Sequence, residues 1–155
     1  TKDKSMFKYH DAFSRNIGWV SEYEQEQLRT KCVAIAGAGG VGSLHMLTLA
    51  RLGIGNFKIS DFDDYEVHNF NRQFGATLST VGHGKMETMA KMVADINPEA
   101  SITTFDGGIN EKNVDEFLSN VDVYVDSLDF FALNARKLVF QRCYELRIPV
   151  VTAAP

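Results

Sequence analysis

Three glycines in one short stretch have the spacing of a phosphate-binding turn. The run VAIAGAGGVGS at residues 33–43 places Gly37, Gly39 and Gly42 in the pattern Gly-x-Gly-x-x-Gly, directly after small apolar residues. In this pattern the first glycine permits a tight turn, the second lets backbone approach a phosphate, and the third lets a helix pack closely on a strand. Free N–H groups at the start of that helix attract a phosphate. The stretch therefore predicts a nucleotide-binding loop, without saying which nucleotide.

An aspartate follows at the distance where the ribose of a nucleotide is expected. Asp61 comes 19 residues after Gly42, at the end of a second apolar run. A carboxylate at this place can accept hydrogen bonds from ribose hydroxyls. Its neighbours Asp63 and Asp64 are expected to be solvated loop acids. The pattern fits a nicotinamide-dependent oxidoreductase as well as an ATP-using enzyme, so these residues alone leave both classes open.

Alternating strands and helices are expected to position these residues. The hydrophobic patterns predict strands at 32–37, 56–62, 101–105, 121–125 and 149–153. They predict helices at 21–29, 43–52, 81–96, 113–118 and 133–146. Such alternation is typical of a mainly parallel sheet with helices on both faces. The predicted fold class is therefore α/β, Rossmann-like and doubly wound.

Composition sets limits on partners and location. The 155 residues carry a formal net charge of −4, which gives no electrostatic reason to expect nucleic acid as a partner. No apolar run approaches the roughly 20 residues that span a bilayer, so we expect no membrane partner. Cys32 and Cys143 have no metal-ligand spacing and are expected to be buried, reduced thiols, which favours a cytoplasmic location.

Further motifs, taken together, resemble a known enzyme family. They are GAGGVGS at 37–43, DFD at 61–63, NFNRQ at 69–73, VGHGK at 81–85, INP at 96–98 and DSLD at 126–129. In this order and at these spacings they resemble the adenylation domain shared by ThiF, MoeB, HesA and the ubiquitin-activating enzymes. The resemblance runs from about Ser14 to Ala154, nearly the whole chain.

The resemblance implies an adenylyltransferase that uses ATP and Mg²⁺. In this family the C-terminal carboxylate of a ubiquitin-like or sulfur-carrier protein, or of a peptide, attacks the α-phosphate of ATP, and pyrophosphate leaves. By the same resemblance, Arg72 and Lys85 bind the triphosphate, Asn69 lies beside the nucleotide, and Asp129 holds the metal ion. The other residues of the expected nucleotide site are Gly37, Gly39, Gly40, Gly42 and Asp61.

The resemblance also assigns a role to the N-terminal segment. Family members carry an N-terminal arginine that reaches the ATP of the partner subunit in a homodimer, and Arg15 lies at the matching place, although its local motif is only partly present. We therefore expect residues 1–30 to form a helical segment that could act as a dimer arm. Residues 31–155 are expected to form the Rossmann-like, ATP-binding adenylation domain, truncated at its C-terminus.

Three other functions stay open. A tRNA-modifying dehydratase of the same family would activate a tRNA-bound carboxylate, although the acidic net charge argues against tRNA. A non-catalytic scaffold subunit is expected to lack phosphate-binding and metal-binding residues, which this chain keeps. An NAD-dependent oxidoreductase would leave Arg72, Lys85 and Asp129 without a role.

Overall fold

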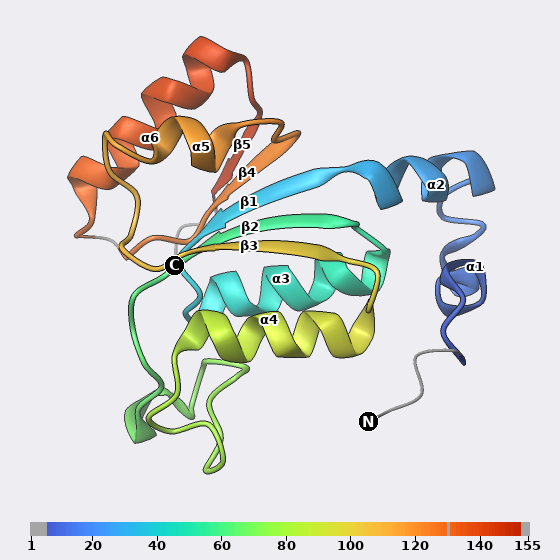
Figure 1. The fold of residues 1–155 in the computed structure, drawn as a ribbon, viewed down its shortest axis with the longest axis horizontal. Coiled ribbons are helices and arrows are strands. Elements are labelled where there is room, and N and C mark those ends of the chain that lie inside the picture. Colours follow the sequence, from blue (N-terminus) through green and yellow to red (C-terminus); the bar gives the residue numbers. More distant parts are fainter. Residues whose placement is uncertain (1–5, 130, 153–155) are drawn as a thin grey trace.

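The structure is a computed structural model that describes residues 6–129 and 131–152, with a five-stranded sheet at its centre (Figure 1). All strand pairings are parallel and the spatial order is β3-β2-β1-β4-β5, so the direction of winding reverses between β1 and β4. The strands are β1 (Cys32–Ala36), β2 (Asn56–Ser60), β3 (Ser101–Phe105), β4 (Val123–Asp126) and β5 (Val150–Thr152). This confirms the predicted α/β class.

Helices cover both faces of the sheet (Figure 1). α3 (Gly40–Leu52) and α4 (Lys85–Ile96) lie on one face, and α5 (Val114–Leu118) and α6 (Leu133–Leu146) lie on the other. Every residue of β1 is buried, because successive side chains of a strand point to opposite faces and both faces are covered here. Among the described residues, no helix is long and apolar enough to cross a bilayer.

Helix α4 begins at Lys85, four residues later than the sequence pattern predicts. The preceding residues pair with another loop instead of continuing the helix. The Gly82 N–H donates to the Tyr65 carbonyl at 2.9 Å, and the Lys85 N–H donates to the Asp63 carbonyl at 3.0 Å. These bonds fix Lys85 as the first residue of the helix and place it beside the residues that follow β2.

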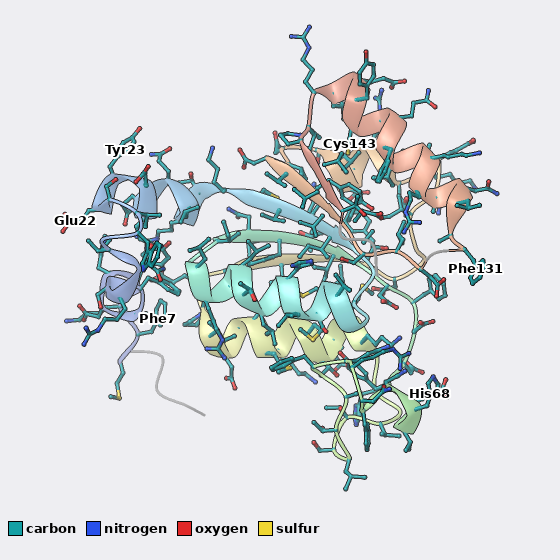
Figure 2. All side chains as sticks on the ribbon, turned by 180° about the vertical axis from the view of Figure 1, so that it is seen from behind. Phe7, Glu22, Tyr23, His68, Phe131 and Cys143 are labelled. Carbon is teal, nitrogen blue, oxygen red and sulfur yellow. The ribbon has the colours of Figure 1, made fainter. Side chains whose placement is uncertain are left out.

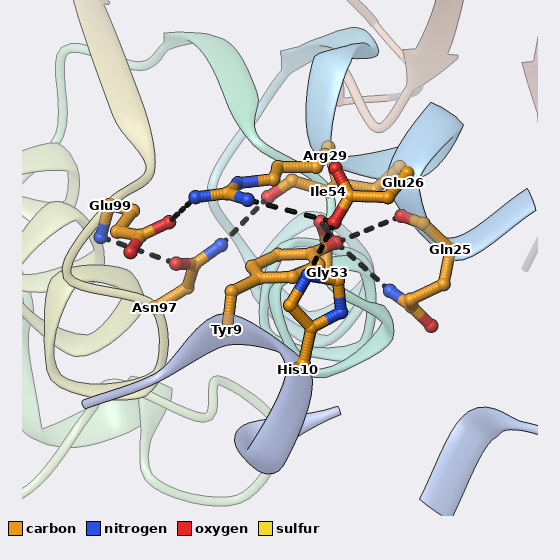
Figure 3. Close-up of polar contacts among 9 residues, drawn as sticks. All are labelled: Tyr9, His10, Gln25, Glu26, Arg29, Gly53, Ile54, Asn97 and Glu99. Carbon is orange, nitrogen blue, oxygen red and sulfur yellow. Dashed lines mark hydrogen bonds and ion pairs between the residues drawn. The ribbon is translucent and has the colours of Figure 1, made fainter. Parts of the chain in front are cut away.

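The N-terminal segment packs against the far end of α3. It comprises α1 (Tyr9–Ala12), the short 3-10 helix η2 (Ser14–Asn16) and α2 (Glu22–Thr30). The Tyr9 hydroxyl donates to the Gly53 carbonyl at 2.6 Å, directly after the last residue of α3 (Figure 3). This contact ties the segment to the end of α3 that is opposite the glycine loop.

Two further side chains hold Tyr9 in place. Gln25 donates from Nε2 to the Tyr9 hydroxyl and to the Leu52 carbonyl, both at 2.9 Å. The Arg29 guanidinium lies 4.7 Å from the centre of the Tyr9 ring and pairs with Glu99 at 2.6 Å (Figure 3). Burial raises the pKa of the Tyr9 hydroxyl, which therefore stays a hydrogen-bond donor at neutral pH. The segment is thus bound through a connected polar cluster.

The outer side of this segment carries exposed apolar side chains. Trp19 is 94% exposed, and Met6 and Tyr23 also face solvent. Figure 2 shows Tyr23 at the edge of the molecule, on the side away from the sheet. The segment therefore has one face bound to the domain and one face without a covering element among the described residues.

We expect Tyr9→Phe to lower the free energy of unfolding by about 1–2 kcal/mol, because the variant leaves buried partners of the hydroxyl unpaired. Guanidinium denaturation followed by circular dichroism measures the change. Tyr23→Phe is the matched control, since the Tyr23 side chain is exposed on neighbouring α2, and it is expected to stay within about 0.5 kcal/mol of the wild type. Equal effects of the two substitutions would contradict the role of the cluster.

Both cysteines are buried and free, as predicted. Burial raises the pKa of the Cys143 thiol to about 11, so the thiol is protonated at neutral pH. Since the thiolate is the reactive form of cysteine, Cys143 acts as a core residue on α6 (Figure 2).

Candidate nucleotide site

The glycine loop joins β1 to α3 at the point where the strand order reverses. Ligands of open α/β sheets bind at this place, outside the carboxyl ends of the strands. Gly37 has a φ of 92° and its N–H donates to the Ser60 carbonyl on β2 at 2.8 Å. Its Cα faces the Ser127 carbonyl after β4 so closely that a Cβ would collide with it. The loop is therefore packed between the ends of β2 and β4.

Asp61 anchors this loop with its carboxylate. Oδ2 accepts the Ala38 N–H at 2.6 Å, and Oδ1 accepts the Asp63 N–H at 2.8 Å. Hydrogen bonds to a carboxylate are stronger than those to a neutral acceptor, so Asp61 holds the loop and the chain after β2 together. Each oxygen keeps a second acceptor position, which a ribose hydroxyl can use.

Lys85 is buried and paired. Its side chain is only 7% exposed, and Nζ lies 2.9 Å from Asp63 Oδ2. As predicted, Asp63 is exposed to solvent, with 54% of its side chain exposed, and its carboxylate is in addition the counter-ion of a buried ammonium group. A buried charge needs such a partner, because leaving it unpaired in a poorly hydrated site is costly.

A pocket connects these charged groups. It has a volume of about 780 Å³, within the usual range of small-molecule sites, and extends from the end of β2 along α4 as far as Ala94, beside Ile102 and Thr104 of β3. Its lining includes Asp61, Asp63, Lys85, Glu87 and Asp106. The structure thus brings two predicted site residues, Asp61 and Lys85, to one cavity, and Asp61 also bonds to the glycine loop.

Arg72 lies next to the loop, with its side chain directed onto its own segment. A Cβ on Gly40 would lie 3.2 Å from the Arg72 carbonyl oxygen, so the two backbones are in close contact. The exposed guanidinium donates from Nη1 to the His68 carbonyl and to Asn71 Oδ1, both at 3.0 Å. These are weak, solvent-accessible partners, which a phosphate can replace.

Asn69 supports the segment that carries Arg72. It is the last residue of the 3-10 helix η3 (Val67–Asn69) and is buried. Its Oδ1 accepts the Glu66 N–H at 2.9 Å. In this structure the Asn69 side chain therefore holds the start of η3, and the role beside a nucleotide stays a prediction.

Asp129 lies beyond the carboxyl end of β4 and is exposed. One of its carboxylate oxygens accepts the Phe131 N–H at 3.1 Å. Among the described residues, no three acidic, histidine or cysteine side chains form a group that could hold a metal. Mg²⁺ is commonly held by one or two carboxylates together with substrate phosphates, and a single exposed carboxylate at this edge fits that arrangement.

A buried ion pair supports the loop before Asp129. Arg136 on α6 donates from Nε to Asp126 Oδ2 and from Nη2 to the Leu128 carbonyl, both at 2.7 Å. Asp126 also accepts hydrogen bonds from the hydroxyls of Tyr124, at 3.1 Å, and Thr152, at 3.2 Å. The carboxylate therefore joins β4, β5 and α6 under the residues that carry Asp129.

Arg15 lies far from this chain's own glycine loop. The adjacent Asn16 donates from Nδ2 to the Leu52 carbonyl at 3.2 Å, at the last turn of α3. Since α3 has 13 residues, that turn is about 20 Å from the first one. Figure 2 shows the same separation, with Phe7 and Tyr23 at one end of the molecule and His68 and Phe131 at the other. Of the predicted site residues, Arg15 is the one that the structure does not bring to this edge.

Comparison with known proteins finds relatives that agree with one another on the family of this chain. The model of the ThiF family matches residues 13–155. The tRNA threonylcarbamoyladenosine dehydratase of Bacillus subtilis (strain 168) is 34% identical over 142 residues, which are 91% of this chain and 55% of that protein. The chain spans about half the length of the curated relatives it matches.

Solved structures agree with the sequence relatives. The E. coli tRNA N6-threonylcarbamoyladenosine dehydratase in complex with ATP has a TM-score of 0.87 and 30% identity, over 92% of this chain and 58% of that chain. The E. coli structure of MccB with ATP has a TM-score of 0.76 and 28% identity, over 92% of this chain and 44% of that chain. The matched family model, supported by these neighbours, shows that the chain belongs to the ThiF family.

Proposed function

We propose that this protein uses ATP to adenylate a carboxylate of an acceptor molecule and releases pyrophosphate. The observation that carries the proposal is that Asp61 bonds to the glycine loop and lines one cavity together with Lys85, beside the carboxyl end of β2. Arg72 and Asp129 lie at the same edge. Solved relatives at 30% and 31% identity hold ATP and AMP, which supports a nucleotide at this place.

In the proposed reaction an oxygen of the acceptor carboxylate attacks the α-phosphorus of ATP. The new O–P bond forms as the bond to the bridging oxygen of the β-phosphate breaks, and its electron pair leaves with pyrophosphate. Such a transfer needs positioning and neutralisation of charge more than covalent participation by the protein. The N–H groups at the start of α3 and the cations Arg72 and Lys85 would orient the triphosphate and stabilise the departing pyrophosphate.

The cations already lie in replaceable contacts. Arg72 would exchange the His68 carbonyl for phosphate oxygens, which its planar guanidinium can bind in pairs. Lys85 would share its charge between Asp63 and the phosphates. Asp129 would hold Mg²⁺ together with phosphate oxygens, and the ion would neutralise part of the charge on the leaving group.

The acceptor has two candidate classes. The notion of a ubiquitin-like or sulfur-carrier protein is supported by relatives such as the ubiquitin-like modifier-activating enzyme 5 of Aedes aegypti, 36% identical over 146 residues. A tRNA-bound carboxylate is the second candidate, favoured by three relatives at 34–38% identity that are named tRNA threonylcarbamoyladenosine dehydratase. Stimulation of pyrophosphate release by tRNA that carries N6-threonylcarbamoyladenosine, or by a small protein with a free C-terminal glycine, distinguishes the two.

We further propose that the protein acts as a cytoplasmic homodimer in which Arg15 reaches the ATP of the partner subunit. Two observations support the dimer. Arg15 is exposed and lies at the end of α3 opposite its own glycine loop. The same segment exposes Met6, Trp19 and Tyr23, which a second copy could cover. The buried free thiols of Cys32 and Cys143 are consistent with a reducing compartment.

Calorimetric titration with ATP tests the proposed function directly. We expect saturable ATP binding, strengthened by Mg²⁺, and no comparable binding of NADH. Exchange of labelled pyrophosphate into ATP in the presence of an acceptor then tests the chemistry. A folded protein that binds no ATP, or that binds NADH instead, contradicts the proposal. ATP binding without exchange for either acceptor class would favour a scaffold subunit.

Lys85→Met is expected to weaken ATP binding by about 10- to 100-fold, because one charge-assisted contact to the triphosphate is lost. Binding of adenosine should change little, since Lys85 acts on the phosphates. Lys137→Met is the control, because Lys137 is exposed on α6, on the opposite face of the sheet from α4. Equal losses for ATP and adenosine would show that Lys85 acts on the fold and not on the phosphates.

A further inference from the structure

Strand β3 is an edge of the sheet that carries none of the usual protection. It lies outermost in the strand order and pairs with β2 alone among the described strands (Figure 1). Natural proteins commonly shield such edges with charged residues, proline or a bulge, because free backbone groups can pair with another chain. β3 has the sequence SITTF, without charge or proline, and its five residues pair with β2 in unbroken register. The edge is therefore open to a further strand.

The hydrogen bonds of β3 show which backbone groups face outward. The Ser101 N–H donates to the Gly55 carbonyl, on the side of β2, at 2.9 Å. Because successive residues of a strand direct their backbone groups to opposite sides, the N–H and C=O groups of Ile102 and Thr104 point away from β2. No loop or side chain of the described residues bonds to these groups. They are available to the backbone of an added strand.

A groove runs beside this edge. The cavity that begins at the proposed nucleotide site continues along α4 from Lys85 to Ala94, a distance of about 14 Å at the rise of a helix. This length equals about four residues of extended chain. Ile102 and Thr104 line the cavity from β3, so the residues with free backbone groups also form one of its walls. A chain paired with β3 would therefore place alternate side chains over this groove.

The charges along the groove are mainly negative. Its lining includes five acids and two lysines, namely Asp61, Asp63, Asp64, Glu87, Asp106, Lys85 and Lys91. Each lysine is already paired with one of these acids. Asp64 and Asp106 are exposed, and no ion pair with another described residue neutralises them. The groove thus complements a partner with basic side chains.

We propose that β3 binds an extended, basic segment of a partner protein, which adds to the sheet as a further strand over this groove. The free backbone groups of Ile102 and Thr104 pair with the segment, so that main-chain bonds supply affinity and alternate side chains supply specificity. Lysine or arginine side chains lay their aliphatic stems on Ala90 and Ala94 and bring their charges to Asp106. The inference goes beyond the proposed adenylation, because this contact needs no nucleotide.

Three labelled peptides test the proposal on the protein without nucleotide. One alternates lysine and valine over roughly seven residues, enough to span β3. The second has glutamate at each lysine position, and fluorescence anisotropy is expected to show about 10-fold weaker binding of it. Added salt should narrow this difference, because salt screens exposed charges. The third is the lysine peptide with every backbone nitrogen methylated, which cannot donate to β3 and is expected to bind about 10-fold more weakly.

Variants of the edge test the same contact from the side of the protein. Thr104→Pro removes an outward N–H, spares the bonds of Ser101 to β2, and is expected to weaken binding of the lysine peptide about 10-fold. Thr104→Val is the matched control, since it keeps the N–H and nearly the same shape, and should stay within about twofold of the wild type. Asp106→Asn should weaken binding of the lysine peptide about threefold and should not weaken binding of the glutamate peptide.

Circular dichroism shows whether each variant is folded, and the methylated peptide decides the test if Thr104→Pro is not. Equal affinity for the lysine and glutamate peptides would overturn the inference. Wild-type affinity in a folded Thr104→Pro variant, or for the methylated peptide, would overturn it as well. Self-association that Thr104→Pro abolishes in analytical ultracentrifugation would assign the edge to a second copy of this chain, again contradicting the inference. Since no nucleotide is present, failure of this inference and failure of ATP binding are separate results.

Discussion

Replacing Gly42 with alanine is expected to abolish measurable ATP binding and to lower the free energy of unfolding by about 3 kcal/mol. Helix propensity alone favours the opposite result, since alanine is preferred over glycine inside a helix by about 1 kcal/mol. The packing around Gly42 decides whether the substitution raises or lowers the free energy of unfolding. A Cβ on Gly42 would overlap the Gly37 carbonyl oxygen and would lie 3.1 Å from the Ser127 Cβ. Relief of these overlaps must move α3 away from the glycine loop.

Gly107→Ala is the matched control for this substitution. Gly107 has no atom within 4 Å of a built Cβ and lacks a left-handed φ, so alanine should be tolerated there. Guanidinium denaturation and calorimetric titration with ATP measure stability and binding for both variants. A Gly42→Ala protein that is as stable as the wild type and binds ATP would refute the close approach of α3 to the loop.

Arg136→Met is expected to lower the free energy of unfolding by about 3–5 kcal/mol, because it leaves a buried carboxylate without its cation. The Asp126 side chain is 1% exposed, and its remaining partners among the described residues are the neutral hydroxyls of Tyr124 and Thr152. Burial, reinforced by the nearby Asp126 carboxylate, raises the pKa of Tyr124, so this hydroxyl does not become a second anion. Guanidinium denaturation measures the loss.

Arg142→Met provides the comparison on the same helix. Arg142 pairs with Asp115 and Glu145 at the surface, where ion pairs contribute about 0–1 kcal/mol. The double variant Asp126→Leu with Arg136→Met removes both charges and should be more stable than Arg136→Met alone. If Arg136→Met and Arg142→Met lose equal stability, Asp126 does not depend on Arg136 for its charge.

The order and type of the elements could be predicted because each leaves a local signal. The predicted helix at 133–146 and strand at 101–105 agree with α6 and β3 residue for residue. The Ser-x-x-Glu spacing of Ser21 and Glu24 is a local signal for the start of α2, and the two residues form a capping box there, with the Ser21 nitrogen 2.8 Å from Glu24 Oε2. The predicted start of α4 was wrong because the observed start depends on hydrogen bonds to residues 63–65, which lie about 20 positions earlier in the chain. The helix propensity of a local stretch of sequence gives no information on such long-range pairings.

In the candidate site, too, the features with a local sequence signal could be predicted and the long-range contacts could not. The glycine spacing and the position of Asp61 predicted the loop, and the structure places both at the carboxyl edge. The pairings of Lys85 with Asp63 and of Arg136 with Asp126 were not predicted, since the crossover connections of the fold bring these side chains together. A buried acid at the end of a central strand, as at Asp126, is the sequence signal that could have prompted a search for its cation.

The exposed indole on the N-terminal segment has a practical consequence. Trp19 is the single tryptophan of the sequence, and the polar cluster around Tyr9 holds its segment at the end of α3 opposite the glycine loop. Its fluorescence therefore reports what covers this segment and is insensitive to direct contact with a nucleotide in the same subunit. A blue shift of the emission with rising protein concentration would reveal association of subunits through this face. The native chain thus carries its own optical probe, placed on the surface proposed for the dimer.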